Sequence, residues 1–223
     1  MVKRIRVGVL ASGRGTDLQS IIDASIDNLI DADVVVVMSD TEDAYALERA
    51  KKHDILAYFI DPTDKTPEEF DDDIDTIATE HHCDLLVGAG FMRILTNDFV
   101  KQWYGKLINI HPSLLPSFKG VQGQGDALAY GVKIAGCTTH FMDNKMDHGP
   151  IILQAAVQVL EDDTEERLSS RILKVEHQIL PRTIQLFAEN RLSIKGRRVH
   201  INPGASWKDT HKLIPHVLYP HGF

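Results

Sequence analysis

The sequence predicts an α/β protein with a mostly parallel, twisted sheet, helices on both of its faces and an antiparallel C-terminal part. Two observations carry this prediction. In the first half of the chain, short runs rich in Val, Ile and Leu alternate with amphipathic segments, which is the rhythm of a parallel sheet. In the second half, two such runs follow one another without a long helix between them, as in an antiparallel pair.

The first half supplies five expected strands and four expected helices. The strands cover residues 5–10, 33–39, 55–60, 83–90 and 106–110, and four consecutive valines in the second suit burial on both faces. The helices cover residues 18–26, 44–54, 66–82 and 97–103. Thr66 before Pro67, with Glu69 three positions after the threonine, is a capping pattern that sets the start of the third helix.

The second half has strand patterns at 136–142 and 150–160, followed by a long amphipathic helix over 164–190. Thr164 is expected to cap that helix, and Pro181 to bend it. An irregular tail is expected after residue 200. The expected organisation is one domain over residues 1–195, followed by a C-terminal strand and irregular tail over 196–223.

Composition narrows the class of protein. A net charge of −8 over 223 residues argues against general affinity for nucleic acid or an anionic membrane. No run approaches the roughly 20 apolar residues that span a bilayer. Cys83 and Cys137 are far apart and have no metal-ligand spacing, so neither a disulfide framework nor a zinc site is expected. We expect a cytoplasmic protein with reduced thiols and no metal; a monomer and a homodimer both stay open.

Asn109 and His111 form the strongest chemical signal, because a buried strand runs directly into them. Side chains two positions apart on a strand project to the same side, so an amide and an imidazole could bracket one small polar atom. That arrangement suits an oxyanion that develops during a reaction. The alternative is a hydrogen-bonded core histidine at a strand end.

Asp147 favours the catalytic interpretation. It lies in a glycine-terminated loop after a strand, and a carboxylate beside an imidazole fixes its tautomer and raises its pKa. The sequence has no GxSxG motif, and leucines follow Ser113, so no protein nucleophile accompanies the three residues. The set therefore suits direct transfer to a nucleophile carried by a substrate. His140 either points into this site beside Asp147 or is a buried structural histidine.

The stretch SGRGTD, residues 12–17, lies between the first strand and the first helix. Glycines before a helix expose backbone N–H groups, which suits a phosphate or carboxylate. The alternative is a tight turn in which Thr16 or Asp17 caps the helix. The motif alone does not decide between the two.

Three stretches together resemble the folate-dependent formyltransferases: NIHPSLLP (109–116), GFMRIL (90–95) and DHGPIILQ (147–154). The resemblance covers roughly residues 5–195. It implies a Rossmann-like formyltransferase fold and transfer of the formyl group of 10-formyltetrahydrofolate to an amine. It also implies that this amine is glycinamide ribonucleotide, a small-molecule substrate of purine biosynthesis, and that no metal takes part.

The resemblance also implies roles for single residues. The catalytic trio is Asn109, His111 and Asp147. Residues implied to bind the folate are Asn109, Phe91, Met92, Arg93, Ile94, Leu95, Met142, Asp143 and Asn144. Residues implied to bind the acceptor are Gly13, Arg14, Gly15, Thr16, Asp17 and Glu176.

Departures from the family pattern concentrate on the acceptor side. Asp17 stands where the family commonly has Asn, the basic residue expected near Pro67 is absent, and Gln122 and Gln124 stand where relatives often carry His. They leave open another amine, such as an amino-sugar nucleotide, or hydrolysis of the formyl donor. A noncatalytic folate- or nucleotide-sensing module is the alternative of a different class. The intact trio argues against it, since a binding module needs no oxyanion donors.

Overall fold

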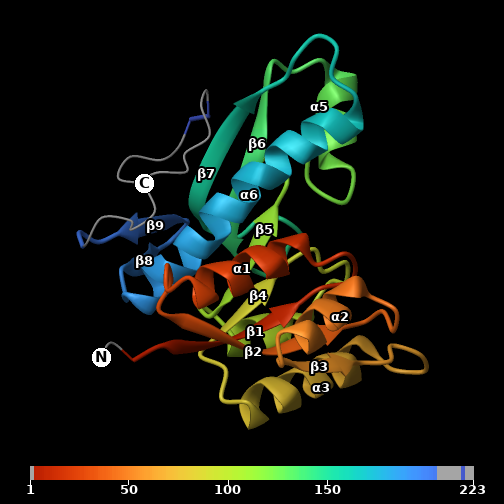
Figure 1. Ribbon diagram of the computed structural model, residues 1–223, viewed down its shortest axis with the longest axis vertical. Coiled ribbons are helices and arrows are strands. Elements are labelled where there is room, and N and C mark those ends of the chain that lie inside the picture. Colours follow the sequence, from red (N-terminus) through yellow and green to blue (C-terminus); the bar gives the residue numbers. More distant parts are fainter. Residues whose placement is uncertain (1–2, 205–216, 219–223) are drawn as a thin grey trace.

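One mixed sheet organises the structure, a computed structural model that describes residues 3–204 and 217–218. The strands found there are β1 (Ile5–Leu10), β2 (Ala32–Ser39), β3 (Leu56–Phe59), β4 (Leu85–Gly88), β5 (Leu107–His111), β6 (Ile134–Phe141), β7 (Ile151–Gln158), β8 (Leu192–Lys195) and β9 (Arg198–Ile201). Their order across the sheet is β3-β2-β1-β4-β5-β6-β7-β9-β8 (Figure 1). Strands β1 to β5 are parallel, whereas β6 is antiparallel to both β5 and β7.

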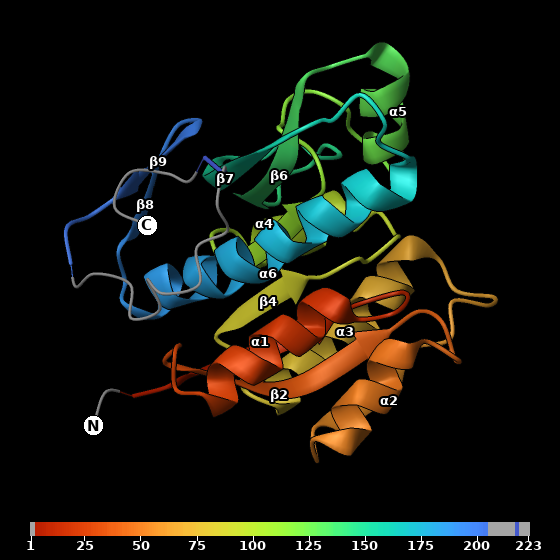
Figure 2. The same cartoon turned by 45° about the horizontal axis from the view of Figure 1, so that its top comes forward.

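Helices cover both faces of this sheet, as the sequence predicts (Figures 1 and 2). The described helices are α1 (Thr16–Ile26), α2 (Tyr45–Lys52), α3 (Pro67–Glu80), α4 (Asn97–Gln102), α5 (Gly123–Tyr130) and α6 (Glu165–Ala188). Helices α1, α2 and α6 share a hydrophobic core with one face, and α3 and α4 share another core with the opposite face. None of the helices in the described ranges is long and apolar enough to cross a membrane.

The central strands are apolar at consecutive positions because both of their faces are buried. In β4, Leu85 and Val87 pack into the core under α1 and α6, while Leu86 packs into the core under α3 and α4. All three side chains are completely buried. A strand between two helical layers therefore reads as a continuous hydrophobic run, without the alternation of a half-exposed strand.

Helix ends confirm two of the sequence predictions. The Thr66 side chain accepts a hydrogen bond from the Glu69 N–H, and the Glu69 carboxylate accepts one from the Thr66 N–H. Thr164 caps α6 by accepting a hydrogen bond from the Arg167 N–H. Caps of this kind contribute about 1 kcal/mol each. Helix α6 continues through Pro181 to Ala188.

Two parts of the second half differ from the expected elements. Helix α5 was not expected, because its segment carries Gly123 and Gly125 and has no amphipathic period; it forms against α6. Strands β8 and β9 form a hairpin that extends the sheet, and the expected domain boundary at residue 195 falls in its turn. That boundary stays a prediction. Most of the expected tail, residues 205–216 and 219–223, lies outside the described residues.

The strand order places three loops together. Strand β1 lies between β2 and β4, so the chain changes direction across the sheet at β1, and ligands of such sheets bind at the carboxyl ends of the strands beside that switch. Here these ends belong to β1, β4 and β5. SGRGTD runs from the loop after β1 into α1, GFMRIL lies in the loop after β4, and NIHPS runs from the end of β5 into the loop after it.

Candidate active site

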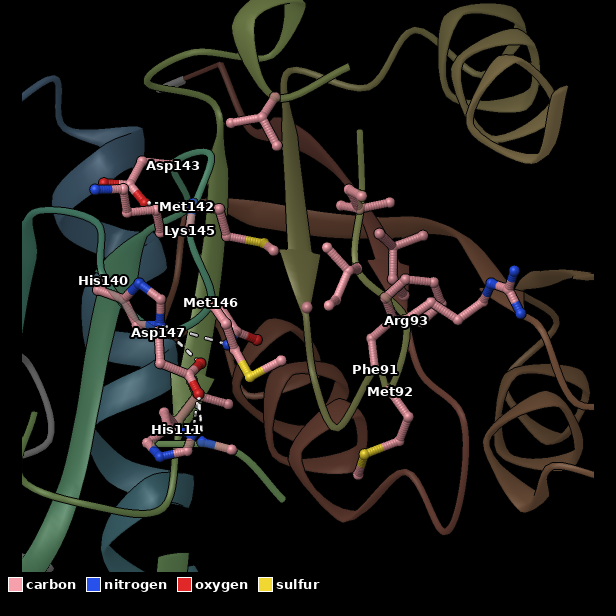
Figure 3. Close-up of a pocket in the computed structure, with 18 of the residues that line it drawn as sticks. Phe91, Met92, Arg93, His111, His140, Met142, Asp143, Lys145, Met146 and Asp147 are labelled. Carbon is pink, nitrogen blue, oxygen red and sulfur yellow. Dashed lines mark hydrogen bonds and ion pairs between the residues drawn. The ribbon is translucent and has the colours of Figure 1, made fainter. Parts of the chain in front are cut away.

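An open cavity lies at the carboxyl ends of β4 and β5 (Figure 3). One wall is the loop after β4, which contributes Phe91, Met92, Arg93, Ile94 and Leu95. The opposite wall is the loop after β6, which contributes Met142, Asp143, Asn144, Lys145, Met146 and Asp147. Asn109, His111 and His140 lie between the walls. The structure thus brings every residue expected at the folate site, together with the expected catalytic trio, around one cavity.

Strand β5 presents Asn109 and His111 to the same cavity, in keeping with the period of a strand. The neighbouring Gly88 of β4 makes room for the amide. A Cβ atom added at Gly88 would lie 2.7 Å from Asn109 Oδ1, well inside van der Waals contact. The Gly88 in LLVGAG is therefore a steric requirement of the Asn109 position.

His140 of β6 orients the Asn109 amide. Its Nδ1–H donates to the carbonyl oxygen of Phe141 (2.9 Å), which leaves the lone pair on Nε2. Asn109 Nδ2 lies 3.4 Å from that atom and can donate to it. Burial lowers the pKa of His140, consistent with a neutral acceptor ring. His140 also lies 4.0 Å from Asp147 Oδ1, so it points into the site, the first of the two alternatives.

His111 is a buried ring held on both edges. Nε2–H donates to the carbonyl oxygen of Phe118 (2.9 Å), and Nδ1 lies 3.4 Å from Asp147 Oδ2. The same carboxylate oxygen accepts a hydrogen bond from the Gly120 N–H (2.8 Å). The contact with Phe118 is short, whereas that with Asp147 is long for a hydrogen bond. When the ring is charged, the Nδ1–H is therefore the donor with capacity to spare.

Asp147 reaches this position from an unusual backbone. The loop after β6 folds back toward β5, and Asp147 has φ 46°, the left-handed region that few residues other than glycine adopt. The following strand pairs with a register shift: His140 lies opposite Ile151, and Thr139 opposite Leu153. Backbone strain of this kind is retained where surrounding contacts fix the chain.

The loop after β1 lies against the same cavity wall. Ser12 Oγ accepts a hydrogen bond from the Met92 N–H (2.9 Å), and the Ser12 N–H donates to the Gly90 carbonyl (3.0 Å). Gly13 and Arg14 are exposed on this loop, and Thr16 begins α1. The expected acceptor residues of the loop therefore adjoin the expected folate residues.

The start of α1 corrects one expectation. Neither Thr16 nor Asp17 caps the helix; the N-cap position is Gly15, in the left-handed conformation with φ 66°. A Cβ atom at Gly15 would lie 2.8 Å from the Ala46 backbone, so both backbone angle and space require glycine. The N-cap side-chain prediction was wrong because the turn before α1 is made by backbone alone.

Asp17 and Glu176 lie behind this loop, between α1 and α6. Asp17 Oδ1 is buried 3.7 Å from His177 Nε2, and neither atom makes a hydrogen bond within the described part of the chain. Burial raises the pKa of Asp17 to about 7. Burial, and then the charge of Asp17, raise the pKa of Glu176 well above its ordinary value. The two expected acceptor ligands are thus a buried acidic pair beneath the loop.

Several residues of the site had weak sequence signals. Lys145, Met146 and the carbonyl of Phe118 were not expected there, nor was His148, which contacts Asp143; Met146 and His148 flank Asp147 in sequence. Across the described ranges, no group of three His, Cys, Asp or Glu residues is placed to hold a metal ion.

Most of this chain is similar to known proteins in sequence and in structure. The family model described as formyl transferase matches residues 5–184. Phosphoribosylglycinamide formyltransferase from Escherichia coli is 39% identical over 216 residues, 95% of this chain and 97% of that protein. The crystal structure of glycinamide ribonucleotide transformylase 1 from Symbiobacterium toebii superposes with a TM-score of 0.89 at 47% identity, over 91% of this chain and 96% of the other.

Longer proteins also contain a similar segment. The trifunctional purine biosynthetic protein adenosine-3 of Chironomus tentans is 42% identical over 199 residues, 88% of this chain. The chain spans 14% of that relative's length. The family match covers most of the chain, and the bacterial relative is matched almost from end to end. The chain therefore belongs to the formyl transferase family.

Proposed function

We propose that this protein transfers the formyl group of 10-formyltetrahydrofolate to the amine of glycinamide ribonucleotide, a step of purine biosynthesis. The observation that carries the proposal is the grouping of Asn109, His111 and Asp147 beside one cavity, without a protein nucleophile. The names of the relatives that match nearly all of the chain support the same acceptor.

The cavity suits a flat heterocycle with polar edges. Apolar side chains line both walls, and two of them, Met92 and Ile94, are 63% and 71% exposed. Exposed apolar side chains beside a few convergent polar groups are typical of ligand sites. We assign the folate to the space between Phe91–Leu95 and Met142–Asn144, where it would supply an activated formyl group.

The protein's contribution to the transfer is to stabilise charge on the formyl oxygen. When an amine attacks the formyl carbon, negative charge develops on that oxygen. Asn109 Nδ2 has two hydrogens, of which His140 Nε2 accepts one; the other has no acceptor among the residues that the structure describes and is available to the oxyanion. The Nδ1–H of His111, only loosely held by Asp147 at 3.4 Å, is the second donor. Phe118 fixes the opposite edge of the ring.

Asp147 has two roles, one toward the charge of His111 and one toward the proton of the attacking amine. Its carboxylate lies 3.4 Å from His111 Nδ1, where it offsets the charge of the imidazolium that donates to the oxyanion. It also accepts, directly or through a water, the proton that the attacking amine must lose. That proton then passes to the folate nitrogen as the bond from this nitrogen to the formyl carbon breaks.

The loop after β1 is assigned to the phosphate of the acceptor. Helix α1 has 11 residues, and its first N–H groups follow Gly15 without a side-chain cap, so they are available to an anion. Asp17 would oppose a phosphate if it faced the loop. Its buried oxygen is instead near His177 of α6, and its raised pKa reduces its charge near neutral pH.

The test is a spectrophotometric assay of tetrahydrofolate release from 10-formyltetrahydrofolate, with and without glycinamide ribonucleotide. Release that requires the ribonucleotide is the expected result. Release without an acceptor would identify a hydrolase, and no release with either would contradict the proposed acceptor. The His111→Ala variant is the control for release that does not pass through this site.

A further inference from the structure

The turn of the β8–β9 hairpin touches the loop that carries Asp147. Strand β9 pairs with the start of β7 through Arg198 and Ile151, which brings the preceding residue, Arg197, to the end of that loop. Arg197 Nη2 donates a hydrogen bond to the His148 carbonyl oxygen (2.6 Å). Arg197 Nη1 lies 3.0 Å from His148 Nε2. Two parts of the arginine therefore hold one residue.

The His148 ring continues this contact into the cavity wall. Its Nδ1 lies 2.6 Å from Asp143 Oδ2, so Nδ1–H donates to the carboxylate. Arg197 Nη1 lies 3.0 Å from Nε2 and 3.2 Å from Nδ1, so the guanidinium packs against the face of the His148 ring. Asp143 in turn accepts a hydrogen bond from the Lys145 N–H (3.0 Å), which closes the loop on itself. These contacts connect the hairpin to the expected folate wall.

Asp147 is the residue in this loop that most needs such support. Its left-handed backbone is unfavourable for a residue with a Cβ atom. On its side-chain end, the Asp147 carboxylate accepts a hydrogen bond from the Gly120 N–H. On its main-chain end, the next residue is His148, whose carbonyl and ring are both held.

We propose that Arg197 is a positioning residue for the transfer reaction: by holding His148, it keeps the Asp147 carboxylate beside His111. The inference rests on the proposed formyl transfer. It assigns a role to the C-terminal hairpin, which lies outside the stretches that carry the family resemblance. Because the Nδ1–Oδ2 distance is already 3.4 Å, a small displacement of Asp147 would weaken its effect on the imidazole.

The test compares Arg197→Ala and Arg197→Lys with a matched control, Arg198→Ala, the exposed neighbour on the same hairpin. Two quantities are measured: kcat and KM for formyl transfer, and the NMR nitrogen chemical shift of His111 Nδ1 at one fixed pH. The His111→Gln variant identifies the His111 resonance. The chemical shift reports the contact between Nδ1 and Asp147 without requiring turnover.

Arg197→Ala is expected to lower kcat about ten- to hundredfold with little change in KM for the acceptor, because a catalytic group is displaced. The nitrogen chemical shift of His111 Nδ1 is expected to change in the same variant, since Nδ1 loses its carboxylate neighbour. Arg197→Lys, which can still donate to the His148 carbonyl, should recover part of both.

Equal kcat and an equal His111 Nδ1 chemical shift in Arg197→Ala and Arg198→Ala would overturn the proposal. A loss of kcat with an unchanged His111 chemical shift would also overturn it, because the effect would then be merely structural. If the wild-type protein transfers no formyl group but the chemical shift changes as expected in Arg197→Ala, the positioning role stands and the proposed function falls.

Discussion

The two sides of the site differ in how their polar groups are paired. Around the catalytic trio, each polar side chain has a partner. Asn109 contacts His140, and His111 contacts the Phe118 carbonyl and Asp147. The Asp147 carboxylate also accepts a hydrogen bond from the Gly120 N–H. Between α1 and α6, buried Asp17 Oδ1 and His177 Nε2 make no hydrogen bond within the described residues. The region assigned to the chemistry is preorganised. In the region assigned to the acceptor, burying a carboxylate charge is unfavourable, and the pKa values of Asp17 and Glu176 are raised as a result.

His111→Ala should break the preorganised side most severely. It removes one oxyanion donor and the charge that Asp147 supports, so kcat is expected to fall about a thousandfold or more. The dissociation constant for the folate should change little, because the cavity walls remain. Steady-state kinetics and fluorescence titration of the folate measure the two effects. An exposed histidine on β9, replaced in His200→Ala, is the control; equal activity in both variants would contradict the assigned role.

Gly88→Ala should impair the catalytic trio indirectly, through Asn109. The added Cβ would lie 2.7 Å from Asn109 Oδ1 and would force the amide away from its position, so kcat should fall about ten- to hundredfold. A double-mutant cycle with Asn109→Ala isolates the cause. If the glycine acts through the amide, the double variant should be no slower than Asn109→Ala alone. Additive losses would show that Gly88→Ala disturbs something else.

Asp17→Asn tests the acceptor side of the site. It removes a negative charge behind the expected phosphate loop, so KM for a phosphorylated acceptor should fall a few-fold. Because the pKa of Asp17 is raised to about 7, the wild-type charge develops as pH rises past neutrality. The ratio of the two KM values should therefore grow between pH 6 and pH 8. An unchanged or higher KM in the variant would contradict the placement of the phosphate.

The same variant should also change stability with pH. A raised folded-state pKa means that folded Asp17 holds its proton more tightly than the unfolded chain does. This contribution is complete below about pH 4 and is lost as pH rises to about 7. The Asp17→Asn variant has no such loss. The difference in Tm between the variant and the wild-type protein should therefore increase from pH 4 to pH 7 and then stay constant. Each kcal/mol of stability corresponds to roughly 2–4 °C in Tm. Asp23→Asn, on the exposed side of α1, is the control.

Sequence patterns predicted the parts of the molecule that depend on local spacing. The buried strands follow from continuous apolar runs, the capping box from the spacing of Thr66 and Glu69, and the shared direction of Asn109 and His111 from the strand period of two. Helix α5 did not follow, because packing against α6 decides it. The Phe118 carbonyl is a backbone atom with no sequence signature. Arg197 reaches His148 only through the pairing of β7 with β9, 49 residues away in sequence.

The orientation of Asp17 shows the same limit. The sequence offers Thr16 and Asp17 as side-chain caps, but the left-handed Gly15 ends the turn first. The carboxylate is then carried around the first turn of α1 toward His177 of α6. Which of two nearby polar groups a short side chain faces depends on backbone angles that composition does not reveal.

The register shift at the start of β7 constrains how this site can evolve. Between the pairs Thr139–Leu153 and His140–Ile151, β7 holds one residue more than β6. A strand advances about 3.3 Å per residue, close to the 3.4 Å between His111 Nδ1 and Asp147 Oδ2. Loss of the extra residue in β7 would therefore draw the preceding loop along the strand by a comparable distance and shift the carboxylate relative to the imidazole. Active variants should therefore tolerate substitutions in this segment, whereas insertions and deletions should be tolerated in other parts of the chain.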